Sequence, residues 1–357
     1  MKKNILSLVC LPLLVMALAA STASAWGPGT HSYIAKELGR KFGYLNLQEM
    51  YGANAPDFPG VMLDPEYYAI RDRLGYLTHY EFKNVVKNAR WSSQKAFAYG
   101  FATHNQEWGA DYWAHIAGYT KNQAAALVAL VTVENPTIWT QVEDNFGLDP
   151  LWVAEMAVEY GIDILIKENL DPAEIGDPEI GLRVLGSALV RSPTVPLLLA
   201  RAYAAPLASV IGASPFEAAK IIIAGEKQFR QLTIRYGTAL SQEDPVDALA
   251  EIAATQFAYL ITTTEPPPDP QVLKGLLKEL AKQLLLTGMN LCKPTYSKVL
   301  QKTIDYVAPE DYGIPLPYTN FSWWRSLDEP EMADPTVAEP SVKFSLGQNH
   351  PNPLRTR

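Results

Sequence analysis

Histidine and acidic residues gather in one part of this chain. Four of its five histidines lie within a segment of about ninety residues, and they are His31, His79, His104 and His115. Asp57 stands before His79, and Glu107 and Asp111 stand between the last two histidines. Imidazole and carboxylate are the nitrogen and oxygen ligands of zinc. A lone histidine or aspartate is commonly structural, but this grouping in a histidine-poor chain predicts a metal site.

The spacing of the later residues bears on how many ions such a site would hold. If the segment is one continuous helix, His104, Asp111 and His115 fall within about 40° of one another on one face. His104 and His115 are then about 16 Å apart along the axis, too far to share one ion. Asp111 and His115, four residues apart, would share an ion or bind adjacent ions. The pattern favours a cluster of several ions over a single zinc.

The first 25 residues are typical of a secretory signal peptide. Lys2 and Lys3 precede an apolar run, and the small residues Ala23-Ser24-Ala25 form a cleavage site. The apolar run is short for a membrane span, and no later run is long and apolar enough to be one. The sequence therefore predicts an exported protein, secreted or periplasmic, whose mature chain begins at Trp26.

Cleavage before Trp26 would change the chemistry of that residue. Its backbone nitrogen is an amide while the signal is attached and becomes an amine afterwards. The amine and the Trp26 carbonyl oxygen can close a five-membered chelate ring on a metal ion. His31, five residues later, can complete that site. An alternative is that Trp26 merely packs against the protein.

Charge and cysteine content narrow the classes of function. Loss of the two positive charges of Lys2 and Lys3 changes the formal net charge from -8 to -10. No basic stripe is present, which argues against a stable nucleic-acid partner. Cys10 leaves with the signal, so Cys292 has no partner for a disulfide within the mature chain.

The elements that must position these residues are helices. Apolar residues recur at three- and four-residue spacing, and prolines preceded by Asp or Ser mark helix starts. No set of alternating runs predicts a sheet, so the fold class is all-α. We expect a helical domain over residues 26–263. A Pro-rich linker and a C-terminal helical extension follow over 264–327, and a polar, Pro-rich tail over 328–357.

Four stretches together resemble a known family. "WGPGTHSYIAKEL", "GANAPDF", "YLTHYEF" and "FAYGFATHNQEWGADYWAHIAGY" look like the zinc-dependent phospholipase C family, which is related to the N-terminal part of glycosylphosphatidylinositol phospholipase D. The resemblance covers roughly residues 26–170. It implies a multi-helix bundle of the phospholipase C/nuclease type, with up to three zinc ions clustered in a cleft.

The resemblance also implies a ligand set. Trp26 and His31 would hold one zinc, and Asp57, with His79 and His104, a second. Asp111 would bridge these two ions, and Asp57 is also the candidate catalytic base. The third zinc would be held by His115 and by acids on a later helix, Glu155 and Glu159, with Asp163 one turn further along.

Two features depart from the family pattern. Glu155 stands where the family has a histidine, so the third site would persist with weaker binding or altered preference. The spacing from His104 to Asp111 is three residues longer than in the members with the most similar motif. A local bulge would absorb the extra residues, or Glu107 would take the ligand role.

The resemblance thus implies an exported zinc-dependent phosphodiesterase of the phospholipase C type. It would hydrolyse the head-group phosphodiester of phospholipids, or another phosphodiester at a membrane surface, by attack of a metal-bound hydroxide. One alternative is a related zinc-dependent single-strand nuclease. The other is a family relic, catalytically weak or inactive, that acts as a binding protein.

Overall fold

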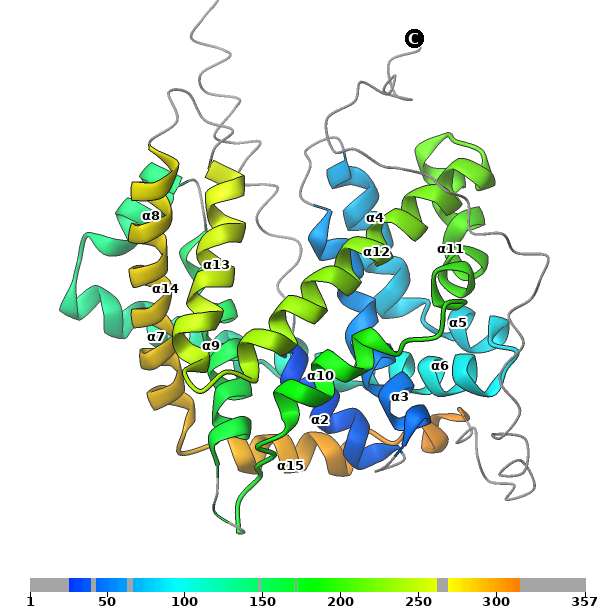
Figure 1. Ribbon diagram of the computed structural model, residues 1–357, viewed down its shortest axis with the longest axis horizontal. Helices are drawn as coiled ribbons and strands as arrows, with labels where there is room; N and C mark the ends of the chain where they lie inside the picture. The colour runs from blue at the N-terminus through cyan, green and yellow to red at the C-terminus, as the bar shows by residue number, and fades with distance from the viewer. Residues whose placement is uncertain are drawn as a thin grey trace, which may run out of the picture.

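The structure, a computed structural model, describes residues 26–39, 43–62, 67–146, 149–169, 171, 173–261 and 269–314 (Figure 1). Every regular element in these ranges is a helix, and they contain no strand. The predicted all-α fold is confirmed. The predicted signal peptide, residues 1–25, and the predicted tail, residues 328–357, lie outside the described residues.

The helices before residue 119 have at most 13 residues, and several of the later ones are longer. In chain order they are α2 (Pro28–Leu38), α3 (Tyr44–Asn54), the 3₁₀ helix η1 (Ala55–Val61), α4 (Tyr68–Tyr80), α5 (Lys83–Asn88), α6 (Ser92–His104), the π-helical turn η3 (Tyr112–Ile116), α7 (Tyr119–Glu134), α8 (Ile138–Phe146), α9 (Pro150–Glu168), α10 (Ile180–Leu189), α11 (Val195–Ile211), α12 (Pro215–Leu240), α13 (Pro245–Ile261), α14 (Pro270–Cys292), α15 (Tyr296–Tyr306) and the 3₁₀ helix η4 (Pro309–Tyr312).

Helices α3 and α6 cross unusually closely. A side chain at Gly52 of α3 would collide with the carbonyl of Phe97, and one at Gly100 of α6 would collide with the carbonyl of Glu49. Only glycine allows two helix backbones to approach this closely. The crossing places the end of α6, which carries a candidate ligand, beside the end of α3 and the start of η1.

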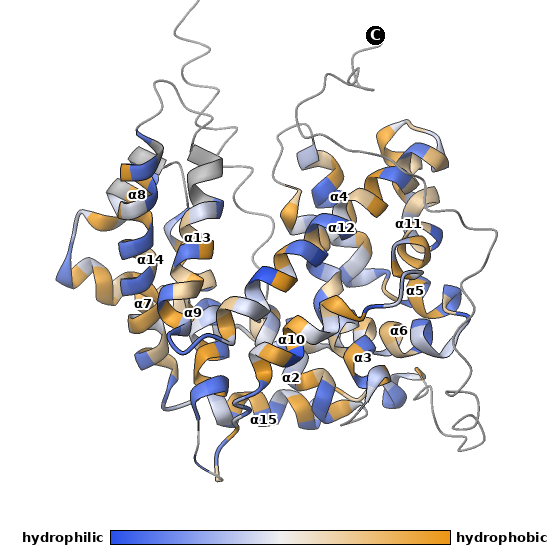
Figure 2. Cartoon of the chain, viewed as in Figure 1, coloured by the Kyte–Doolittle hydropathy of each residue, from blue (hydrophilic) through white to orange (hydrophobic). Residues whose placement is uncertain are grey.

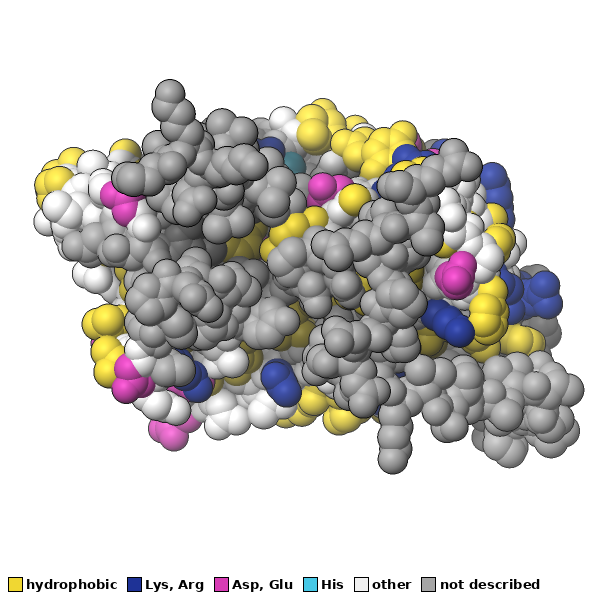
Figure 3. Space-filling view, turned by 90° about the horizontal axis from the view of Figure 1, so that it is seen from above, with side chains coloured by type: hydrophobic (Ala, Val, Ile, Leu, Met, Phe, Trp, Pro, Cys, Tyr) yellow, Lys and Arg dark blue, Asp and Glu magenta, His cyan; other side chains and the backbone are white. Residues whose placement is uncertain are grey.

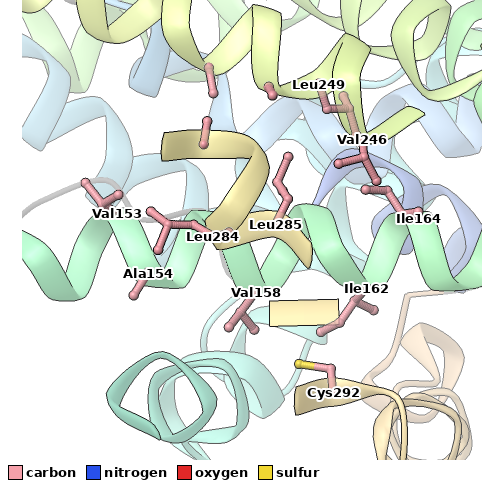
Figure 4. Close-up of a cluster of buried hydrophobic side chains, with 14 of the residues drawn as sticks. Val153, Ala154, Val158, Ile162, Ile164, Val246, Leu249, Leu284, Leu285 and Cys292 are labelled. Carbon is pink, nitrogen blue, oxygen red and sulfur yellow. The ribbon is translucent and has the colours of Figure 1, made fainter. Parts of the chain in front are cut away.

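Helix α9 lies at the centre of one hydrophobic core. It packs against α2, α7 and α14. Figure 4 shows part of this core, where Val153 of α9 lies near Leu284 of α14, and Val158 and Leu285 belong to the same core. Cys292 is fully buried in the same core. A second core, built around α4, α6, α11 and α12, includes Phe58, Phe97 and Tyr203.

The C-terminal helices pack on the same body as the N-terminal ones. Leu273 and Leu277 of α14 are buried, while Lys274, Lys278 and Lys282 lie on its outer side and pair with acids of α13. Figure 2 shows the resulting mixture of hydrophobic and hydrophilic residues along the helices. Helix α14, in the predicted C-terminal helical extension, is therefore part of the packed fold.

No single helix among the described residues has the length and hydropathy to cross a membrane. Helices α11 and α12 meet that test only as a pair, and the pair is bent by 118°.

Candidate metal centre

The first group of candidate ligands joins η1, α4 and α6. Asp57 of η1 places its Oδ1 atom 3.5 Å from His79 Nε2 and 3.5 Å from His104 Nε2. The two imidazole Nε2 atoms are themselves 3.1 Å apart. Ligand atoms of this group all lie within 4.8 Å of one another, so one ion can be held between them.

Backbone carbonyls fix the two imidazoles in orientation. His104 Nδ1 donates to the carbonyl of Ala53, and His79 Nδ1 donates to the carbonyl of Gly75, both at 2.8 Å. Because a carbonyl only accepts, the proton of each ring lies on Nδ1 and Nε2 is left to bind a metal. Outer hydrogen bonds of this kind accompany most metal-binding histidines.

Asp111 joins the first group to a second one, which contains His31, His104 and Asp111. Its Oδ1 atom lies 3.1 Å from His104 Nε2 and 3.6 Å from His31 Nε2, and its Oδ2 atom lies 3.2 Å from His79 Nε2. The rings of His31 and His104 stack, with centroids 4.1 Å apart. Asp111 is therefore placed to bridge two ions.

The segment from His104 to His115 is not one continuous helix, so the calculated face does not apply. Helix α6 ends at His104, and Asn105 turns the chain. The Asn105 side-chain oxygen accepts hydrogen bonds from the backbone N–H groups of Glu107, Trp108 and Gly109. This turn absorbs the three extra residues and returns Asp111 to His104. Glu107 is exposed and belongs to no candidate group, so it is not the bridging residue.

The third group is His115 with Glu155 and Glu159 of α9. His115 lies in the π-helical turn η3, which changes its direction relative to Asp111. His115 Nε2 is 3.4 Å from Glu155 Oε1, and that oxygen also accepts a hydrogen bond from Thr120. No candidate group among the described residues contains both Asp111 and His115, so the structure favours adjacent ions over a shared one.

Trp26 and helix α2 are held against the centre by two contacts. The Trp26 side chain is fully buried, and its Nε1–H donates to the carbonyl of Ala110, the neighbour of Asp111. Asp163 of α9 accepts from the backbone N–H groups of Gly29 and Thr30, from the Thr30 hydroxyl and from the Tyr236 hydroxyl. It thus caps the first turn of α2, whose own N-cap residue offers no side-chain bond.

This capping role replaces the one that the sequence suggested for Asp163. Its carboxylate lies in none of the three groups. A Cβ atom at Gly27 would lie 2.5 Å from Asp163 Oδ2, and one at Gly29 would lie 2.7 Å from Asp163 Cγ. The two glycines near the start of α2 are therefore needed for the carboxylate to approach, which the sequence reasoning did not foresee.

Burial and the neighbouring charges shift the pKa values of the histidines in opposite directions. Burial and the neighbouring His104 lower the pKa of His31 to about 3, so its ring is neutral and its lone pair is free for a metal. Burial also acts to lower the pKa of His79, but the carboxylates of Asp111 and Asp57 outweigh it and raise that pKa to about 9. The same carboxylates raise the pKa of His104. Metal binding there would release protons.

The pKa values of the acidic residues are also shifted in opposite directions. Burial acts to raise the pKa of Asp57 and Asp111, but the positive charge of His104 outweighs it and holds both below their usual range. Burial, followed by repulsion from neighbouring carboxylates, raises the pKa of Glu159 well above its ordinary value. Burial likewise raises the pKa of Glu155, and that of Asp163 to about 6.

Several buried polar atoms of the centre have no hydrogen bond of ordinary geometry. They are His31 Nε2, both carboxylate oxygens of Asp111, His115 Nε2 and both carboxylate oxygens of Glu159. Buried polar groups are rarely left unpaired in a native protein, and an ion is one common reason. The donor set, of imidazole nitrogens and carboxylate oxygens, fits a divalent metal such as zinc.

One side of the centre reaches solvent. The side chains of Asp57 and His79 are 18% and 12% exposed, while those of His31, His104 and Asp111 are at most 1% exposed. Figure 3 shows one face of the molecule, where a small part of a histidine side chain is visible near a basic and an acidic side chain. The centre is therefore accessible from solvent along the side of Asp57 and His79.

No protein-family model, curated protein or solved structure matches this chain. The resemblance to zinc-dependent phospholipases C accordingly remains a prediction that rests on the residues themselves.

Proposed function

We propose that the chain is a zinc-dependent phosphodiesterase of the phospholipase C type. One observation carries the proposal. Residues from η1, α2, α4, α6, α9 and the η3 region converge into three adjacent groups of metal-ligand type, and four of them carry unpaired buried atoms. The members are His31, Asp57, His79, His104, Asp111, His115, Glu155 and Glu159.

The residues of the centre would have different roles in such a reaction. Bound zinc would supply Lewis acidity and a hydroxide at neutral pH. The buried residues His31, His104 and Asp111 would fix the ions. The Ala53 carbonyl and the stacked ring of His31 hold His104 in orientation. Asp57, partly exposed and held ionised, can accept a hydrogen bond from the attacking water and orient it. On a phospholipid, the products would be diacylglycerol and a phosphorylated head group.

Export belongs to the same proposal. If the mature chain begins at Trp26, its amine and carbonyl would join His31 in holding one ion. The burial of Trp26 and its bond to Ala110, next to Asp111, support this arrangement. Protein that begins at Trp26 should retain one more zinc per chain than protein with a single extra residue ahead of it. Equal zinc content in the two proteins would remove Trp26 from the ligand set.

The direct test is hydrolysis by protein with a known metal content. Protein beginning at Trp26 is stripped of metal, reloaded with zinc and given phosphatidylcholine in mixed micelles. We expect release of phosphocholine that depends on zinc and is lost in Asp57→Asn. A variant at the exposed Asp144, Asp144→Asn, serves as the matched control. Folded, zinc-loaded protein that cleaves no phosphodiester would support the relic alternative.

A nuclease remains the second candidate because of one feature. Tyr76 and Tyr80 of α4 stack with centroids 5.1 Å apart and are 49% and 39% exposed, beside His79 on the same helix. Exposed aromatic rings of this kind can stack with nucleobases. Single-stranded DNA is therefore included in the hydrolysis test, and preferential cleavage of DNA over phosphatidylcholine would favour this candidate.

A further inference from the structure

The third group of ligands differs in chemistry from the other two. His115, Glu155 and Glu159 offer one imidazole and two carboxylates. Each of the other groups offers two imidazoles and one carboxylate, from His31, His104 and Asp111 or from Asp57, His79 and His104. Imidazole suits zinc, whereas carboxylate suits harder cations such as Mn²⁺ and Mg²⁺. The third group thus has a second carboxylate where each of the other groups has a second imidazole.

The local structure holds these carboxylates ready for a cation. The side chain of Glu155 is 5% exposed and that of His115 is 7% exposed, while Glu159 is fully buried. Thr120 donates to Glu155 Oε1 and so fixes that carboxylate toward His115. Both oxygens of Glu159 are unpaired. Buried carboxylates are costly unless a cation is near, and His115 is the only basic side chain in the group.

Charge balance separates the groups as well. Two carboxylates, Glu155 and Glu159, match the charge of one divalent ion in full. Asp57 and Asp111 together would serve two ions, so that pair of ions would keep a net positive charge. A phosphate would be drawn to the pair rather than to the third ion, which its own ligands neutralise.

We propose that the His115–Glu155–Glu159 subsite binds a harder divalent cation of the Mn²⁺ class, while the histidine-rich pair binds zinc. The inference rests on the proposed function, because it assumes that the neighbouring groups hold metal. It assigns Glu155 the role of setting metal preference at one subsite.

The experiment counts metals on the folded, full-length mature chain. Metal-free protein receives three equivalents of Zn²⁺ together with an excess of Mn²⁺, and unbound ions are removed by gel filtration. Elemental analysis counts both metals, and the electron paramagnetic resonance spectrum identifies bound Mn²⁺. We expect two zinc and one manganese per chain.

Variants of α9 make the test specific. Glu155→His restores an imidazole, so Mn²⁺ retention should fall at least tenfold while a third equivalent of zinc is bound. Glu155→Gln should lose the manganese and keep two zinc ions, which keeps the test valid if the histidine variant folds poorly. Glu168→Gln, an exposed position on the same helix, should match the wild type. Circular dichroism melting checks the fold of each.

The outcomes separate this inference from the proposed function. Two or three retained zinc ions with no manganese in the wild type, or equal manganese in wild type and Glu155→His, would overturn the inference alone. Folded protein that retains no metal at any subsite would overturn the proposed function and the inference with it.

Discussion

Asp111 is the residue on which the centre most depends. Its two oxygens approach three histidines, at 3.1 Å, 3.2 Å and 3.6 Å, and neither oxygen has a hydrogen bond of ordinary geometry. A carboxylate buried among imidazoles in this way is poised for ions rather than for structure. Its loss would affect both neighbouring groups, because its oxygens lie near His31 and His104 of one group and near His79 of the other.

We therefore expect Asp111→Asn to weaken zinc binding by more than the roughly 10–100-fold that follows loss of an outer-shell partner. The neutral amide keeps the size of the side chain but removes the charge that would bridge two ions. Isothermal titration of metal-free protein with zinc measures the change. Asp144→Asn, an exposed control, should leave the affinity unaltered. An affinity within twofold of the wild type would contradict the bridging role.

For individual residues, the sequence indicated which side chains could bind a metal. It did not indicate which other residues would form hydrogen bonds with them. Imidazole and carboxylate chemistry identified the candidates, because only a few side chains can bind zinc. The hydrogen bond from Thr120 to Glu155 and the capping role of Asp163 were not foreseen. Such contacts join residues up to 134 positions apart and leave no periodic signal in the chain.

At the scale of elements, α2 is positioned by α9. Asp163 accepts from the first free N–H groups of α2, and Gly27 and Gly29 leave room for it. Because His31 directly follows Thr30, whose N–H group donates to Asp163, this cap also sets the place of one candidate ligand. The position of α2 therefore depends on Asp163, and the position of His31 in the candidate metal site depends on α2.

Gly29→Ala should accordingly destabilise the protein and disturb the His31 group. Its Cβ atom would lie 2.7 Å from Asp163 Cγ, and overpacking of this kind costs about 1–3 kcal/mol. Urea unfolding measures the loss, and zinc content reports on the ligand. Gly275→Ala is the matched control, since nothing lies within 4 Å of its Cβ position in α14. It should stabilise by about 0.5–1 kcal/mol.

The Asn105 turn is the second element with a clear role. One side-chain oxygen satisfies three backbone N–H groups and lets Asp111 return to His104. We expect Asn105→Ala to cost about 1–3 kcal/mol, because buried donors lose their acceptor. It should also lower zinc affinity, although Asn105 is in none of the ligand groups. Thermal melting and zinc titration test both, with the exposed Asn290→Ala as control.

This turn also shows why element boundaries were harder to predict than element type. The spacing of apolar residues correctly indicated helices throughout the described chain. A face calculated at 100° per residue assumes an unbroken helix, and Asn105 breaks it by accepting bonds that the helix would otherwise make. The π-helical turn at Tyr112–Ile116 then shifts the register once more. Both changes follow from local hydrogen bonds that periodicity does not record.

For the whole molecule, we expect the free energy of unfolding to fall at high pH because a buried thiol of the core, Cys292, would ionise on unfolding. Burial raises the pKa of the Cys292 thiol to about 12, compared with an ordinary value of 9.0. A raised folded-state pKa gives stability that is complete below pH 9 and is lost as the pH rises toward 12. The shift corresponds to at most about 4 kcal/mol. Unfolding free energies should therefore decline over this range.

Cys292→Ala provides the comparison. The variant starts from a different stability at neutral pH, so the slope between pH 9 and pH 12 is compared rather than the value. We expect a shallower decline in the variant, measured by urea unfolding at several pH values. Identical slopes would show that the buried tyrosines, and not the thiol, account for the loss. The thiol itself should stay unreactive toward alkylating reagents until the chain unfolds.

The bond from Gly29 to Asp163 also bears on when the centre can assemble. It spans 134 residues, so α2 has no cap until α9 is present. During synthesis, the first part of the chain must wait for about two fifths of the residues that follow it. The ligand group of His31 would therefore be completed late, after α9 has emerged, and metal uptake would take place in whichever compartment the chain finishes folding.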